Sequence, residues 1–331
     1  MSRMKFNSFL QSKIEEYIIY RQTYGFTGIN ERDNLSVFDK YLHRKMSKTL
    51  NELDGKFFLE MVALESERCL PQTVGQRISV IYGFFQYLVR IQVVENNPLT
   101  FMARPRGLYY RPHIFNPQEI KLIIDYLSKR IMHGQCKGFF LARLAHYTAI
   151  TLQAACGLRI SEVINLKIEH FNLKDETLYI HRSKFRKDRL IPISSKTIMN
   201  LQNYLNTRRS IIGSNNENPY FFLTYWKDKG NRKTLAQYFF MAVKELGMYQ
   251  PPQIKGNVIM GSPCTHSLRH SFAVNTIRRW KAQGKNINQI SDTLATYMGH
   301  CSFSNTQTYL KALNHDPQIL IFDYHKNQCE R

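Results

Sequence analysis

Acidic residues are scarce in this sequence. Its 331 residues include 25 aspartates and glutamates against 46 lysines and arginines, which gives a formal net charge of +21. Because the basic residues are spread along the whole chain and are not confined to a tail, the balance favours a polyanionic partner, above all nucleic acid. A ribosomal protein, or a protein with a basic membrane-facing surface, is the alternative interpretation of the same charge.

Paired cysteines are also absent. The six cysteines are widely separated and form no Cys-x-x-Cys pair: Cys69, Cys136, Cys156, Cys264, Cys301 and Cys329. This spacing argues against a structural zinc site and against a disulfide scaffold, and it predicts reduced thiols in a cytoplasmic protein. The sequence contains no HExxH motif, no Asp-x-Asp type of carboxylate cluster and no P-loop. We therefore expect neither a metal nor another cofactor.

No apolar run is typical of a membrane segment. The most apolar stretch, residues 138–158, contains Arg143, His146 and Gln153, and such residues favour a buried helix over a membrane span. The first thirteen residues, MSRMKFNSFLQSK, lack the apolar centre of a signal sequence. With 43% hydrophobic and 13% aromatic residues the chain can form real cores, and its length favours two domains.

The first 95 residues predict a small helical bundle. Apolar residues recur at three-and-four spacing, which is typical of amphipathic helices, in residues 14–20, 35–42, 57–65 and 74–90. Asp33 or Asn34, Asp54 and Thr73 are the candidate N-caps for three of these helices. Basic residues between the helices could contact phosphates, although ordinary surface charge explains them equally well.

Residues 96–113 differ in composition from their neighbours. Prolines and a glycine mark an interdomain linker. Its arginines, Arg104, Arg106 and Arg111, would suit a strap that lies along a DNA backbone. A flexible tether whose arginines are incidental is the alternative.

The remainder of the chain predicts helices and one small β element. Asn116 is a candidate N-cap, with Pro117 at the first helical position and Glu119 two residues after it, and Gly157 would end a long helix over 138–156. Further helices are expected at 160–167, 195–212, 233–247 and 266–280, and from 286 to Gly299. Residues 220–226 suggest a short strand and residues 248–263 an irregular segment.

A basic β-hairpin is predicted between these helices. Residues 177–181 and 189–194 resemble two strands, and RSKFRKD joins them. Lys184 in this bend could give a proton to a leaving oxygen, and Lys187 is its competitor, since the local sequence does not separate them. Together with Arg182 and Arg186, Lys187 is also a candidate DNA contact.

Residues suited to phosphodiester chemistry gather in the last third of the chain. THSLRHSFA at 265–273 places His266 and Arg269 three residues apart, on one face of a helix. GHCSFSNTQTY at 299–309 follows with His300 and Tyr309, and GLRISEV supplies Arg159 from far upstream. Two arginines could bind the non-bridging oxygens of a phosphodiester as these oxygens gain charge. For either arginine alone, a buried salt bridge is the simpler interpretation.

Tyr309 is the preferred candidate for an oxygen nucleophile. A free tyrosine has a pKa of ~10, and neighbouring cations activate it by favouring the phenolate. Tyr309 lies nine residues after His300 in a polar segment, which ranks it above Tyr297 and Tyr324. Glu162 could orient a side chain near Arg159, but we expect a structural role for it.

The order of these motifs resembles the tyrosine recombinase, or phage integrase, family. The motifs GLRISEVINLK, SKFRKDRLIPIS, HSLRHSFA and MGHCSFSNTQTYL follow one another within roughly residues 115–315. The resemblance implies a mainly α fold with a small β-sheet. It implies a helical core-binding (SAM-like) DNA-binding domain over 1–95, a basic linker over 96–113 and an α+β catalytic domain over 114–331.

The resemblance also implies an enzymatic mechanism. Its catalytic residues would be Arg159, Lys184, His266, Arg269, His300 and the nucleophile Tyr309. They would cleave and rejoin DNA through a 3′-phosphotyrosyl link without metal or ATP. Implied partners are double-stranded recombination sites, three further copies of the chain in a homo-tetramer, and accessory directionality proteins.

The expected biological role is that of an integrase or transposase of a mobile element, in the cytoplasm of a bacterium and associated with the nucleoid. A chromosome-dimer resolvase is the nearest alternative with the same chemistry, and a type IB topoisomerase shares the active site. A DNA-binding regulator that does not cleave, and a metal-dependent nuclease, are alternatives from other classes.

Overall fold

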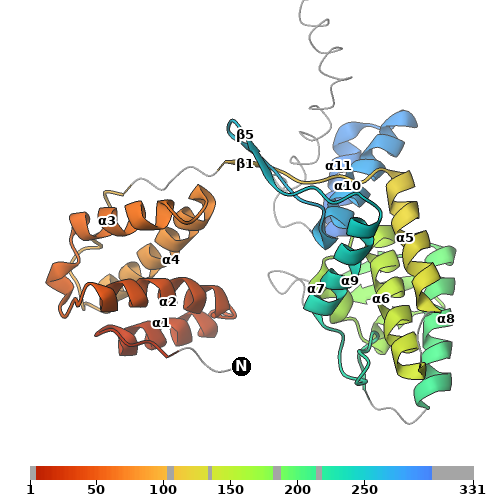
Figure 1. Ribbon diagram of the computed structural model, residues 1–331, viewed down its shortest axis with the longest axis horizontal. Coiled ribbons are helices and arrows are strands. Elements are labelled where there is room, and N and C mark those ends of the chain that lie inside the picture. The colour runs from red at the N-terminus through yellow and green to blue at the C-terminus, as the bar shows by residue number, and fades with distance from the viewer. Residues whose placement is uncertain (1–4, 103–107, 133–135, 182–187, 214–217, 300–331) are drawn as a thin grey trace, which may run out of the picture. The chain divides into compact units, whose positions relative to one another are not determined.

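The computed structural model describes the chain except for residues 1–4, 103–107, 133–135, 182–187, 214–217 and 300–331, and except for the side chains of 287–290. The chain divides into two compact units, Met1–Tyr109 and Tyr110–Arg331. The described residues are mainly helical and include two three-stranded sheets (Figure 1). The predicted fold class is therefore confirmed.

The first unit is a helical bundle. Its elements are α1 (Gln11–Thr23), α2 (Ile29–Arg44), the 3₁₀ turn η1 (Leu50–Glu52), α3 (Gly55–Ser66) and α4 (Pro71–Arg90). All four predicted helices are present. Aromatic rings fill the centre of the bundle, where Phe58 lies edge-on to Phe85 with 5.5 Å between ring centroids, and Phe38 lies 6.1 Å from both.

Only one of the N-caps predicted for these helices is confirmed. Asp54 accepts a hydrogen bond from the backbone N–H of Phe57 at the start of α3. Asp33 and Asn34 lie inside α2, because Gly28, with a φ of +72°, lets the chain enter this helix five residues earlier than Asp33. Thr73 lies inside α4, whose first residue is Pro71. A proline at the first helical position is a start signal in its own right.

The helices of the second unit surround α6 (Lys137–Cys156). This helix contacts α5 (Pro117–Ile131), α7 (Ile160–Ile164), α8 (Ser195–Ile212), α9 (Arg232–Glu245) and α10 (Thr265–Ala282), and α11 (Ile287–Met298) packs on α10. The predicted capping box of Asn116 and Glu119 begins α5, and Gly157, with a φ of +60°, ends α6. None of the described helices is both long and apolar enough to cross a membrane.

The predicted basic hairpin forms two of the three strands of one sheet. The order in this sheet is β2 (Phe171–Asn172), β3 (Thr177–Ile180) and β4 (Arg189–Pro192), with antiparallel neighbours. Thr177 pairs with Pro192 and Ile180 with Arg189. The residues between Ile180 and Arg189 join these two strands, and 182–187 among them are outside the described part of the chain.

Two expectations for the second unit are wrong. Residues 248–263 are not wholly irregular, because β5 (Gln253–Lys255) and β6 (Val258–Met260) pair there, and β1 (Tyr109–Arg111) completes the sheet in the order β1-β6-β5. Residues 220–226 form isolated bridges at Tyr220 and Leu223 and no strand. Their consecutive apolar residues 221–223 are all buried, which removes the alternation of a half-buried strand.

Candidate active site

Of the predicted site residues, the structure describes Arg111, Arg159, His266 and Arg269, and it brings the last three together. Arg159 is the N-cap of α7, whereas His266 and Arg269 lie in the first turns of α10. Arg111 ends β1, where its carbonyl accepts a hydrogen bond from the N–H of Gly261. The other predicted site residues lie outside the described part of the chain: Arg104, Arg106, Arg182, Lys184, Arg186, Lys187, His300 and Tyr309.

Arg269 is almost fully buried, with 1% of its surface exposed. Its Nη1 donates to the carbonyl of Gly157 and its Nη2 to the carbonyl of Met298, both at 2.7 Å. An isolated buried guanidinium would be costly, so these carbonyls are part of what holds it in place. One arginine thus joins the end of α6 to the end of α11.

Arg159, which lies much earlier in the sequence, also binds the end of α11. Its Nη1 donates to Oε1 of Glu162 at 2.7 Å, and its Nη2 donates to the carbonyl of Gly299 at 3.2 Å. Its backbone N–H donates to Oε2 of Glu162 at 2.9 Å. Glu162 therefore caps its own helix, which is the structural role expected for it, and it also orients the Arg159 side chain.

Arg189, which the sequence analysis did not single out, is a third arginine of the site. Its Nη1 and Nη2 donate to the two carboxylate oxygens of Glu162 at 3.0 and 2.9 Å, and its Nε donates to the carbonyl of Tyr297 at 2.9 Å. A signal was present in the sequence. Arg189 shares one face of its strand with Ile191, which is buried, and an arginine on a buried face needs partners.

We call Arg159, Arg189, Arg269 and Glu162 the arginine cluster. The Glu162 side chain is 3% exposed, and Nη1 of Arg269 lies 4.0 Å from its carboxylate. Burial raises the pKa of Glu162, but the hydrogen bond and charge of Arg189, together with those of Arg159, outweigh it and hold the pKa below its ordinary value. Three guanidiniums thus converge on one ionised carboxylate, and positive charge is in excess there.

The arginine cluster holds the last carbonyls of α11. Each of its guanidiniums donates to one of three consecutive carbonyls: Arg189 to Tyr297, Arg269 to Met298 and Arg159 to Gly299. The last carbonyls of a helix have no hydrogen-bond partner within the helix and form the negative end of its dipole, so nearby cations stabilise them. The next residue in the sequence is His300.

His266 is a neutral imidazole at the edge of the arginine cluster. Burial lowers its pKa to about 4, and the charges of Arg269, Arg159 and Arg232 lower it in the same direction. Its ring lies edge-on to His270 with 4.5 Å between centroids. A neutral imidazole can accept or pass on a proton, which suits a site where an O–H must be deprotonated.

Tyr297 is unsuited to nucleophilic attack. Its hydroxyl donates to the carbonyl of Pro192 at 3.3 Å. Burial, followed by the neighbouring Cys156, raises its pKa well above the ordinary value for tyrosine. A phenol that resists ionisation is a poor nucleophile, which agrees with its rank below Tyr309.

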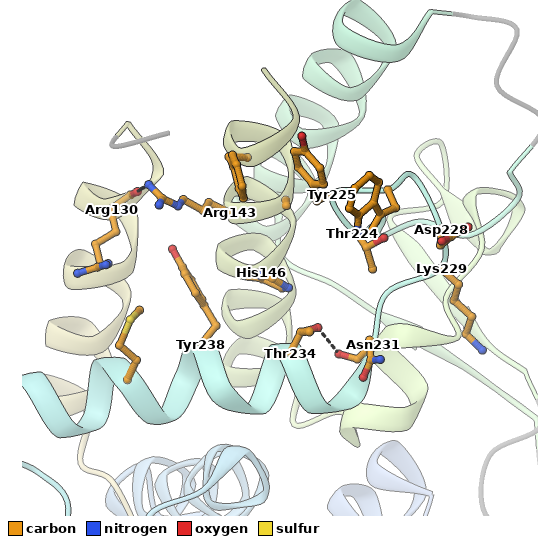
Figure 2. Close-up of a pocket in the computed structure, with 14 residues that line it drawn as sticks. Arg130, Arg143, His146, Thr224, Tyr225, Asp228, Lys229, Asn231, Thr234 and Tyr238 are labelled. Carbon is orange, nitrogen blue, oxygen red and sulfur yellow. Dashed lines mark hydrogen bonds between the residues drawn. The ribbon is translucent and has the colours of Figure 1, made fainter. Parts of the chain in front are cut away.

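A cavity of about 630 Å³ lies elsewhere in the second unit, and no residue of the arginine cluster lines it. Figure 2 shows side chains from α5, α6 and α9 and from the segment 224–231 around it, among them Arg143, His146 and Tyr238. Burial lowers the pKa of His146 to about 4, and its ring lies 5.0 Å from that of Tyr238.

The sequence profile of the phage integrase family matches residues 115–315, which include every member of the arginine cluster. The chain belongs to this family. It is a tyrosine site-specific recombinase, an enzyme type that cleaves and rejoins DNA, with a helical region before the integrase catalytic domain.

Individual proteins are similar to the chain in sequence or in fold. The chain is 28% identical over 308 residues to the candidate integrase/recombinase y4rE of Sinorhizobium fredii, covering 92% of each sequence. Its fold is similar to the XerH recombinase bound to a palindromic difH substrate in a post-cleavage complex, with a TM-score of 0.65, 20% identity and coverage of 93% and 82% of the two chains. It is also similar to a lambda integrase tetramer bound to a Holliday junction, with a TM-score of 0.64, 17% identity and coverage of 91% and 76%.

Proposed function

We propose that the chain is the integrase or transposase of a mobile element and that Tyr309 is its nucleophile. The observation that supports this most directly is the arginine cluster, which holds the backbone up to Gly299 against three guanidiniums. The chain continues from there to His300 and Tyr309. The full-length similarity to an integrase/recombinase of Sinorhizobium fredii supports the choice of a mobile element.

Cleavage begins with a DNA phosphodiester whose non-bridging oxygens contact Arg159 and Arg269. The Tyr309 oxygen attacks phosphorus and forms the P–O bond of a 3′-phosphotyrosyl link, while the bond to the 5′ oxygen breaks. Lys184 gives that oxygen its proton, and His266 or His300 accepts the proton of the phenol. The two arginines neutralise the charge that accumulates on the phosphate oxygens in the transition state.

Strand transfer reverses these steps on a partner duplex. The freed 5′ hydroxyl attacks the phosphotyrosyl link, so the bond energy is retained and no ATP is consumed. The substrate is a pair of double-stranded recombination sites, and the assembly is a homo-tetramer, in line with the lambda integrase tetramer on a Holliday junction. Accessory proteins set the direction.

The proposed organisation assigns DNA contacts to each part of the chain. Residues 1–95 form the core-binding domain, residues 96–113 a linker that lies on the DNA backbone, and residues 114–331 the catalytic domain. Contacts to phosphates come from the linker and the hairpin bend: Arg104, Arg106, Arg111, Arg182, Arg186 and Lys187.

Trapping on nicked suicide DNA tests the chemistry. In EDTA, the wild-type protein should form a covalent adduct with DNA that carries the element's ends, and Tyr309→Phe should form none. Tyr297→Phe is the matched control and should retain the adduct, because the Tyr297 hydroxyl donates a hydrogen bond to the carbonyl of Pro192 and its pKa is raised. Adduct formation by Tyr309→Phe would show that another residue is the nucleophile. Binding without any adduct from the wild type would favour a DNA-binding regulator.

A second experiment separates the mobile element from a chromosome-dimer resolvase. DNA covalently linked to the protein in its own host can be purified and sequenced. Element boundaries in that DNA would support the proposal. A single chromosomal site, present whether or not an element is, would replace it with the resolvase.

A further inference from the structure

We infer that Arg189 is a positioning residue for DNA cleavage: it holds strand β4, Glu162 and the end of α11 in one fixed arrangement. This inference rests on the proposed function, since it concerns the same reaction. It concerns a residue that need not contact the DNA. Arg189 would act through the groups to which it donates hydrogen bonds.

The geometry of the Arg189 side chain is that of a bridge. Its Nη1 and Nη2 bind both oxygens of Glu162, and its Nε binds the carbonyl of Tyr297. Because the guanidinium is planar and rigid, the bidentate pair of bonds to Glu162 and the third bond to Tyr297 fix the position of α11 relative to that carboxylate. The side chain is 11% exposed, so water competes little for these bonds.

Charge neutralisation alone does not explain Arg189. Glu162 already receives the guanidinium of Arg159 at 2.7 Å, so a second arginine is not needed to pair the carboxylate. Among the described residues, Arg189 is the side chain that donates a hydrogen bond to the carbonyl of Tyr297. Arg189 thus adds a second link between Glu162 and the end of α11, beside the one that Arg159 makes to Gly299, and this is what a positioning role requires.

Arg189 also lies at the base of the basic hairpin. It is the first residue of β4, pairs with Ile180 in β3, and follows Lys184 by five residues in the sequence. The same side chain therefore fixes the strand that follows Lys184 and the helix end that precedes His300. Loss of Arg189 would loosen both of these segments, β4 and the end of α11, while leaving Arg159 and Arg269 in place.

Arg208 in α8 is a matched control. It is 3% exposed, and it donates to the carbonyls of Asn218 and Phe221 at 2.8 and 3.1 Å. It is therefore another buried arginine of the second unit that holds backbone carbonyls. It makes no described contact with the arginine cluster, so it reports the general cost of losing such a residue.

The test compares the full-length wild type with Arg189→Gln, Arg189→Lys and Arg208→Gln on nicked suicide DNA. Three quantities are measured: the Kd for the site, the rate of adduct formation at saturating protein in a single turnover, and Tm. For Arg189→Gln we expect the rate to fall by about 10- to 100-fold, as for a small displacement of reacting groups, while Kd changes by less than about threefold. Arg189→Lys keeps the charge but not the planar fork, so its rate should recover only in part.

Arg208→Gln should lower Tm and leave the rate at saturation unchanged. The inference is overturned if Arg189→Gln cleaves at the wild-type rate, if it changes Kd alone, or if Arg208→Gln loses the same factor in rate. Should Arg189→Gln fail to fold, Arg189→Lys is compared with Arg208→Lys by the same criteria. A wild type that forms no adduct would overturn the proposed function instead, so the two failures are distinguishable.

Discussion

At the scale of single residues, His266 shows how burial selects a protonation state. Its pKa of about 4 lies below the ordinary value of 6.5, first because it is buried and then because Arg269, Arg159 and Arg232 are nearby. His270 faces it across 4.5 Å. Burial and the neighbouring arginines therefore favour the neutral form of the imidazole.

The low pKa of His266 predicts a pH-dependent stability. The unfolded chain binds a proton below the ordinary pKa of 6.5, whereas the folded chain does not until about pH 4. His266 therefore contributes to stability above pH 6.5, and this contribution is lost as the pH falls toward 4. We expect His266→Gln to flatten the rise in Tm between these values. His146→Gln removes a second histidine whose pKa is about 4, and it should flatten the rise in Tm independently. If neither variant changes the slope of Tm against pH, the low pKa values of these histidines are contradicted.

At the scale of elements, the end of α11 depends on a glycine. Gly299 has a φ of +64°, and a Cβ at this position would lie 3.0 Å from Nη1 and 3.2 Å from Cδ of Arg189. Because Arg189 is held by Glu162 and Tyr297, it cannot move aside without losing these bonds. The helix end and the arginine cluster thus constrain each other.

Gly299→Ala tests this mutual constraint. A left-handed alanine costs about 1 kcal/mol or more through its backbone alone, and Gly299→Ala adds displacement of Arg189, so we expect slower cleavage as well as a lower Tm. Gly284→Ala is the control, because Gly284 has a φ of +74° and open space around its Cβ position. It should lower Tm and leave the cleavage rate at saturation unchanged. Equal rates for the two variants would show that the contact with Arg189 is immaterial.

Local patterns in the sequence predicted most elements of the fold, because those elements depend on neighbouring residues. The capping box at Asn116, the glycine that ends α6 and the alternation of the basic hairpin are all signals within a few positions. The β5–β6 pair escaped prediction because each strand has only three residues. Arg189 escaped because its partners, Glu162 and Tyr297, lie 27 and 108 positions away.

At the scale of the whole molecule, the net charge of +21 should control the affinity of the enzyme for DNA and its dependence on salt. Each phosphate contact releases counterions, so the logarithm of the binding constant should fall linearly with the logarithm of salt concentration, with a slope of roughly −0.9 per contact. Long-range charge and the chemistry of the arginine cluster are therefore separable. The first sets affinity and its salt dependence, whereas the second sets the rate of cleavage once DNA is bound.

The double variant Arg182→Gln, Arg186→Gln tests this separation at the hairpin bend. If both side chains contact phosphates, the slope of the salt dependence should become shallower by about two contacts, roughly 1.8, and cleavage at saturating protein should stay close to wild type. Arg189→Gln should do the reverse, keeping the slope and slowing cleavage, because Arg189 is inferred to act through Glu162 and Tyr297 and not to contact a phosphate. Lys121→Gln, on the exposed surface of α5, controls for the loss of a charge. A slope unchanged in the double variant would remove both residues from the DNA contacts, and a slope reduced by Arg189→Gln would make that arginine a phosphate ligand.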